Sequence, residues 1–263
     1  GGVETPLLGG AEHDAGDVEE EPPLATADHD PSPREAEDRN LWQAAGTAEF
    51  WILFVLLVNG AGSSLVLLNN LGEMVEALGG GHDGQDVFVS LFSIANCCGR
   101  LLAGYTSQLA LRRYGVPRTW FLLWSAVGTS LICLLASVSS LPMLYPTSFL
   151  MGLCFGCYWS LFPTVTSEVF GLRHMGSIYN TLMSAPAIGG LTFSYFASIL
   201  YERARARDTS LGDACIGVDC FRPTFLYLAG IGCVGVAAAG LMVRRTRAVY
   251  ARVYAQLLLH QSH

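Results

Sequence analysis

Six long apolar stretches constrain the fold of this chain more than any other feature of its sequence. Each is close to the roughly 20 residues that an α-helix needs to cross a bilayer. Inside hydrocarbon, every backbone polar group must be paired within its own segment, which makes such stretches helices. We therefore predict an all-α membrane protein, with six transmembrane helices at Phe50–Leu71, Val87–Leu109, Trp120–Val138, Leu141–Val165, Ile178–Leu200 and Thr224–Val243.

Charged residues are few and unevenly placed. They make up 14% of the chain, against about a quarter in soluble domains. Residues 1–47 hold twelve acidic residues and two arginines, so their net charge is near −10, whereas the whole chain carries −7. The acidic balance therefore belongs to one segment and gives no reason to expect a nucleic-acid partner. That segment is rich in Gly, Pro, Ala, Asp and Glu, and we expect it to be disordered.

Arginine placement predicts the orientation, because cytoplasmic loops carry an excess of basic residues. If the acidic segment is cytoplasmic, four arginines lie on the opposite face. Eight lie on the cytoplasmic face: Arg112, Arg113, Arg118, Arg173, Arg244, Arg245, Arg247 and Arg252. The cluster of Arg203, Arg205 and Arg207 argues the other way. We expect a multi-pass protein with a cytoplasmic segment at 1–47, a six-helix domain at 48–247 and a cytoplasmic tail at 248–263. Nothing in the sequence identifies the membrane.

Small and polar residues gather in the first and fourth spans. Each of these spans opens a triplet of helices, and glycine lets a membrane helix bend or approach a neighbour closely. Interrupted helices in matching repeat positions point to a transport path, although close packing alone explains them equally well. Helix–helix hydrogen bonds or aromatic packing are similar alternatives for the neutral polar residues. The candidates for the substrate pathway are Asn59, Gly60, Gly62, Asn96, Gly156, Tyr158, Trp159 and Asn180.

Arg100 lies within the otherwise apolar second span and needs a partner. The sequence places it toward the cytoplasmic side, where the only acidic residue at a comparable depth is Glu168. We hypothesise an Arg100–Glu168 ion pair that holds the cytoplasmic side closed, with Arg112 or Arg113 as competing partners. The alternative is that each side chain extends separately to the lipid headgroups.

Two of the eight cysteines, Cys215 and Cys220, lie in a polar loop on the predicted non-cytoplasmic face. Disulfides persist outside the cytoplasm, so this pair is a disulfide candidate, with two free thiols as the alternative. The other six lie in apolar stretches, where cysteine behaves as a small hydrophobe. We read Cys154 and Cys157 in this way, and we expect neither a metal site nor a cofactor.

The run from Tyr158 to Thr181, YWSLFPTVTSEVFGLRHMGSIYNT, resembles the plant nuclear-fusion-defective, nodulin-like proteins of the major facilitator superfamily. The resemblance extends over about 50–243. It implies the C-terminal half of a twelve-helix transporter. This half would consist of two inverted three-helix repeats, and the acidic segment would connect the two halves. Glu168 and Arg173 resemble the superfamily's cytoplasmic signature, which adds Arg173 to the predicted gate. Gly99-Arg100-x-x-x-Gly104 resembles the start of its loop motif, but Ser107-Gln108 stands where an aspartate is usual.

We therefore expect part of a secondary transporter that moves a small solute across a lipid bilayer by alternating access. Its partner would be a missing N-terminal six-helix half or a second copy of the chain. An enzyme is not expected, because no HExxH or GxSxG motif occurs and no nucleophile pairs with a base. The alternative function is a non-transporting multi-span adaptor or receptor. The sequence does not identify the solute.

Overall fold

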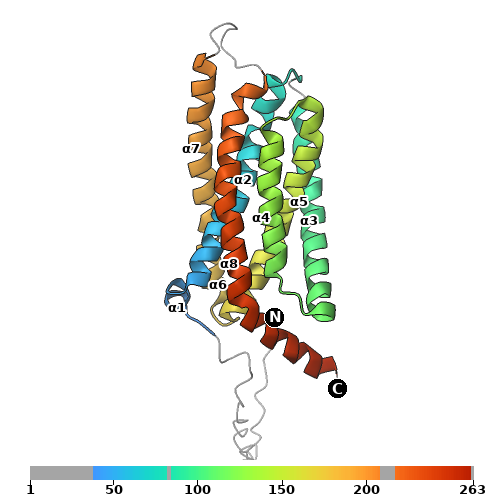
Figure 1. Ribbon diagram of the computed structural model, residues 1–263, viewed down its shortest axis with the longest axis vertical. Helices are drawn as coiled ribbons and strands as arrows, with labels where there is room; N and C mark the ends of the chain where they lie inside the picture. The colour runs from blue at the N-terminus through green and yellow to red at the C-terminus, as the bar shows by residue number, and fades with distance from the viewer. Residues whose placement is uncertain (1–37, 82–83, 208–216, 262–263) are drawn as a thin grey trace, which may run out of the picture. The chain divides into compact units, whose positions relative to one another are not determined.

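The computed structural model describes residues 38–81, 84–207 and 217–261, and the side chains of these residues other than 207 and 256–261. Six helical spans in these ranges are long and apolar enough to cross a membrane, which confirms the predicted all-α membrane fold. The spans run side by side and alternate in direction (Figure 1). They consist of α2 (Ala48–Ala77), α3 (Gln85–Tyr114), α4 (Thr119–Ala136), α5 (Leu141–Phe170), the pair α6 (Met175–Leu182) and α7 (Ser184–Arg207), and α8 (Arg222–Gln261).

Two short helices complete the described part of the chain. The first, α1 (Leu41–Ala45), precedes α2, and Thr47 caps α2 by accepting a hydrogen bond from the Phe50 backbone N–H. The second is a 3₁₀ turn, η3 (Val218–Cys220), which leads into α8. Residues 1–37, including most of the predicted acidic segment, lie outside the described residues.

The fifth span differs from its prediction, because it is two helices that meet at Met183. Pro186 explains the break: it has no N–H for the carbonyl of Leu182, and its ring crowds that carbonyl. In contrast, α2 and α5 continue without a break through their glycine-rich stretches, and α5 also contains Pro146 and Pro163. The first and fourth spans are therefore continuous helices at the glycine-rich stretches that the sequence singles out.

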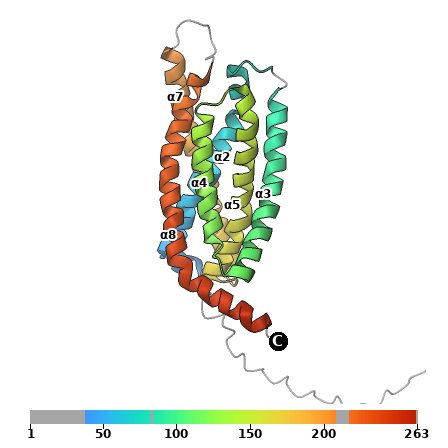
Figure 2. The same cartoon turned by 45° about the vertical axis from the view of Figure 1, so that its right-hand side comes forward.

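Three helix pairs make most of the contacts: α3 with α5, α4 with α8, and α2 with α7. Figure 2 shows α3 beside α5, and α4 beside α8. The α3–α5 crossing depends on glycine, because a Cβ atom on Gly99, Gly152 or Gly156 would overlap a backbone carbonyl oxygen of the partner helix. Small residues of this kind let membrane helices approach closely.

The α2 helix is the most buried of the six spans and lies at the centre of the packing. Besides α7, it contacts α3, α4, α5 and α8. Gly62 of α2 lies against the backbone of Gly189 in α7, so each glycine makes room for the other helix. The polar stretch of the first predicted span is thereby enclosed within the bundle.

Candidate functional site

A narrow polar gap lies between α2, α4, α5 and α8, in the middle of the bundle. It is nowhere wide enough for a water molecule, so the residues that line it lie close together. Its lining residues are Leu56, Asn59, Gly60, Ala126, Thr129, Tyr158, Gly232 and Gly235. Three of the predicted pathway residues therefore share one location, on α2 and α5.

Hydrogen bonds and ring packing close this gap. Asn59 Nδ2 donates to the carbonyl oxygen of Ile231 in α8 at 3.0 Å. The Tyr158 hydroxyl lies 3.4 Å from Thr129 Oγ1 on α4, and the Tyr158 ring packs on Gly60. Tyr158 is fully buried. The gap is thus a closed polar contact among four helices, and Gly60 provides the space for the aromatic ring.

Gly62 and Gly156 lie away from the gap. Gly62 is at the α2–α7 contact, and Gly156 is pressed against the backbone of Asn96 and Arg100 in α3. For these two candidates, helix packing accounts for the choice of glycine.

A second polar cluster lies on the outer face formed by α3 and α5. Arg100 Nε donates to Asn96 Oδ1 at 3.1 Å, and the guanidinium lies 5.5 Å from the ring centroid of Trp159. Arg100 is exposed, while Asn96 and Trp159 are half-buried. The indole N–H of Trp159 is buried without a hydrogen-bond partner among the described residues. Asn180 is exposed on α6, next to Tyr179.

The predicted Arg100–Glu168 pair is wrong, because Arg100 bonds to Asn96 instead. Arg100 is the sixteenth of the thirty residues of α3, counted from Gln85, so it lies at the middle of the helix rather than toward one end. Glu168 is two residues from the end of α5. The two residues therefore lie at different depths, whereas the sequence-based prediction places them at a similar depth.

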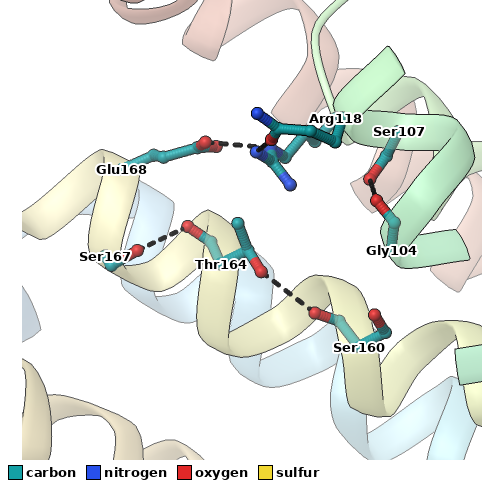
Figure 3. Close-up of polar contacts among 8 residues, drawn as sticks. Gly104, Ser107, Arg118, Ser160, Thr164, Ser167 and Glu168 are labelled. Carbon is teal, nitrogen blue, oxygen red and sulfur yellow. Dashed lines mark hydrogen bonds and ion pairs between the residues drawn. The ribbon is translucent and has the colours of Figure 1, made fainter. Parts of the chain in front are cut away.

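Glu168 forms its ion pair with Arg118, which directly precedes α4, at 2.9 Å between Oε1 and Nε (Figure 3). The two side chains are only 15% and 11% exposed. Arg118 Nη2 also donates to Gln108 Oε1 on α3. Tyr250 of α8 is buried and interacts electrostatically with Glu168. These four side chains join α3, α4, α5 and α8 at what we call the Glu168 end of the bundle.

Two further contacts hold the same end together. Glu49 of α2 pairs with Arg245 of α8, with 3.0 Å between Oε1 and Nη1. The backbone N–H of Arg173 donates to Asp38 Oδ1 at 3.3 Å. Gly171 adopts a left-handed conformation, with φ of 85°, against which Asp38 packs. Glu168 and Arg173 thus lie at the same end, and Arg173 contributes its backbone there.

Residues 43–252 match the family described as "NFD4, C-terminal domain". The chain belongs to this family. Among curated proteins it is 29% identical over 211 residues to "Protein NUCLEAR FUSION DEFECTIVE 4" of Arabidopsis thaliana, a match that covers 78% of this chain and 36% of that protein. It is also 31% identical over 159 residues to "Probable transporter MCH1" of Eremothecium gossypii, covering 59% of this chain and 34% of the relative. The corresponding Saccharomyces cerevisiae protein is 25% identical over 220 residues, with 81% and 44% covered.

The chain therefore spans between about a third and just under half of the length of these relatives. The family match agrees with the predicted resemblance to nuclear-fusion-defective proteins and places it in their C-terminal domain. In this NFD4 C-terminal domain, Gln108 takes part in the Arg118–Glu168 network as a neutral acceptor. It is one of the two residues that stand where the superfamily usually has an aspartate.

Arg118 is the functional candidate that sequence reasoning missed. In the sequence it is one of several loop arginines, and no helical periodicity relates it to a carboxylate fifty residues later. The available signal was its place between Pro117 and the start of α4, where a side chain is held close to the bundle end.

The loop cysteines are described only in part. Cys220 is buried and disulfide-bonded, while Cys215, its predicted partner, lies outside the described residues. Within the described ranges, no group of three or more His, Cys, Asp or Glu side chains is placed to hold a metal ion.

Proposed function

We propose that this chain is one half of a secondary transporter that moves a small solute by alternating access. The other half would be six helices encoded upstream or a second copy of the chain. The proposal is supported by the six spans, by the NFD4 C-terminal family and by relatives named as probable transporters. Because the chain spans less than half of each of those relatives, a larger functional unit is the natural expectation.

The observation that carries the proposal is the exposed polar cluster of Asn96, Arg100 and Trp159 at the middle of α3 and α5. An arginine at the centre of a bilayer costs about 2.5–3.5 kcal/mol on insertion scales. This face is therefore unsuited to lipid and suited to water or to a second protein half. Substrate sites of transporters lie at such an interface, near the midplane.

The contacts at the Glu168 end support a half that moves as a unit. The Arg118–Glu168 and Glu49–Arg245 pairs join α4 to α5 and α2 to α8. Because both pairs lie within this half, they are suited to keep its helices together while the half moves as one body against the other half. We further propose that this end is cytoplasmic, as the arginine count favours.

Solute uptake into proteoliposomes that contain the full-length gene product tests the proposal. A broad panel of labelled small solutes should include at least one that accumulates above protein-free vesicles and saturates with concentration. If no solute accumulates and the reconstituted protein binds another protein specifically, the adaptor or receptor alternative is favoured.

A further inference from the structure

The C-terminal part of α8 extends well beyond the predicted sixth span. The helix has forty residues, about twice the number that crosses a bilayer, and the predicted span ends at Val243. Figures 1 and 2 show the last part of α8, in dark red, turning away from the long axis of the bundle and passing across its end. We call the part of α8 after Val243 the α8 extension.

One face of the α8 extension is fixed to the bundle. Thr246 Oγ1 lies 3.1 Å from Thr119 Oγ1 at the start of α4, and Tyr250 is buried. Tyr254 packs on Gly115, where a Cβ atom would lie 3.2 Å from the tyrosine ring. Side chains four residues apart lie on the same face of a helix. The opposite face of the extension is therefore directed away from the bundle.

Four exposed arginines lie around this contact. Arg244 and Arg247 belong to the α8 extension, and Arg112 and Arg113 belong to the last turn of α3. Because the glycine that ends α3 touches the extension, both pairs lie at the Glu168 end of the bundle. We call these four side chains the basic face.

The basic face has no counter-charge within the part of the chain that the structure describes. None of its arginines forms an ion pair there. The described carboxylates at this end are Asp38, Glu49 and Glu168, and each binds an arginine outside the basic face. Four formal positive charges are therefore available to an anionic partner.

The lengths of the helices place the basic face in the layer of the lipid headgroups. The thirty residues of α3 measure about 45 Å, which is close to the thickness of the hydrocarbon core with both headgroup layers. The last turn of α3 therefore lies beyond the hydrocarbon, and Arg244 directly follows the predicted sixth span. Clusters of four or more basic residues beside a membrane helix attract anionic lipids.

We propose that the basic face binds the headgroups of anionic phospholipids and that this binding holds the α8 extension on the membrane surface. Guanidinium groups bind phosphate oxygens through paired, charge-assisted hydrogen bonds. The extension also carries Tyr250, which interacts electrostatically with Glu168, so a bound lipid would stabilise the packing at this end. The inference goes beyond the proposed transport function and does not depend on it.

The test uses the purified full-length protein in a neutral detergent and follows thermal unfolding. Phosphatidylserine should raise the unfolding midpoint saturably, and phosphatidylcholine should not. Arg244→Gln combined with Arg247→Gln should weaken the apparent affinity for phosphatidylserine about thirtyfold, since each basic residue near an anionic surface contributes about fivefold. The matched control is Arg203→Gln combined with Arg222→Gln, at the opposite end of the bundle. It should leave the affinity unchanged.

Two further measurements keep the test independent of any one variant. The second pair, Arg112→Gln combined with Arg113→Gln, should weaken the affinity to a similar extent. With the wild type, salt at about 1 M should remove the effect of phosphatidylserine, because a Debye length near 3 Å screens exposed charges.

Three results would overturn the proposal. The first is equal stabilisation by phosphatidylcholine, and the second is unchanged affinity in both arginine pairs. The third is an effect of phosphatidylserine that appears only after the acidic residues of 1–37 are replaced by their amides. That result would assign the basic face to the acidic segment of the chain itself.

Discussion

The Arg118–Glu168 pair connects the start of α4 to the end of α5, and both side chains are largely buried. Glu168→Gln should therefore destabilise the protein by roughly 3 kcal/mol, because it leaves a buried guanidinium without its counter-ion. Denaturant titration of the purified protein measures the loss. The matched control is Glu202→Gln, an exposed carboxylate in an i,i+3 pair with Arg205, which should cost less than about 1 kcal/mol.

The double variant decides whether the two residues interact directly. If they do, Arg118→Gln combined with Glu168→Gln should cost less than the two single changes added together, by about 0.5–3 kcal/mol. If the two losses in the free energy of unfolding simply add, the ion pair itself contributes no stability.

At the scale of single residues, the sequence showed which side chains needed partners but not which partners they had. Arg100 and Glu168 were both recognised as charges in apolar helices. Their assignment to one another failed because Arg100 lies at the middle of α3, whereas Glu168 lies two residues from the end of α5 and pairs there with Arg118. Asn59, Gly60 and Tyr158 were selected for polarity and size, and the structure brings all three to one gap.

At the scale of elements, α3 and α5 cross closely because the glycines at their crossing have no Cβ atom. Gly156→Ala would place a Cβ against the carbonyl oxygen of Asn96, which belongs to a helix backbone and cannot turn aside. Overpacking of this kind typically costs about 1–3 kcal/mol, and thermal unfolding would report it. Gly240→Ala is the control, because nothing lies within 4 Å of its Cβ; it should be neutral or slightly stabilising. Equal effects of the two changes would contradict the close crossing.

Hydropathy predicted the existence of each span well and its internal geometry less well. Apolar length alone is enough to mark a helix that crosses a bilayer. Pro186 lies next to the break in the fifth span, whereas α5 continues through Pro163 although that residue also lacks an N–H. The sequence shows both prolines, but the effect of each depends on the helices that pack around it.

At the scale of the whole molecule, six spans place both ends of the domain on one side of the membrane. Arginine placement predicts that this side is cytoplasmic. An epitope tag after His263 should therefore be accessible in intact cells only after the plasma membrane is permeabilised, or in isolated organelles without permeabilisation. A tag exposed on the non-cytoplasmic side would contradict the orientation.

Alternating access requires the Asn96–Arg100–Trp159 face to meet water from each side of the membrane in turn. With the native cysteines replaced in the full-length protein, Asn96→Cys reports this through a charged thiol reagent that does not cross membranes. Leu131→Cys, on the exposed apolar face of α4, is the matched control. We predict that position 96 is labelled when the reagent is supplied from either side, and that position 131 is labelled from neither. No labelling at position 96, or labelling from one side alone, would contradict alternating access.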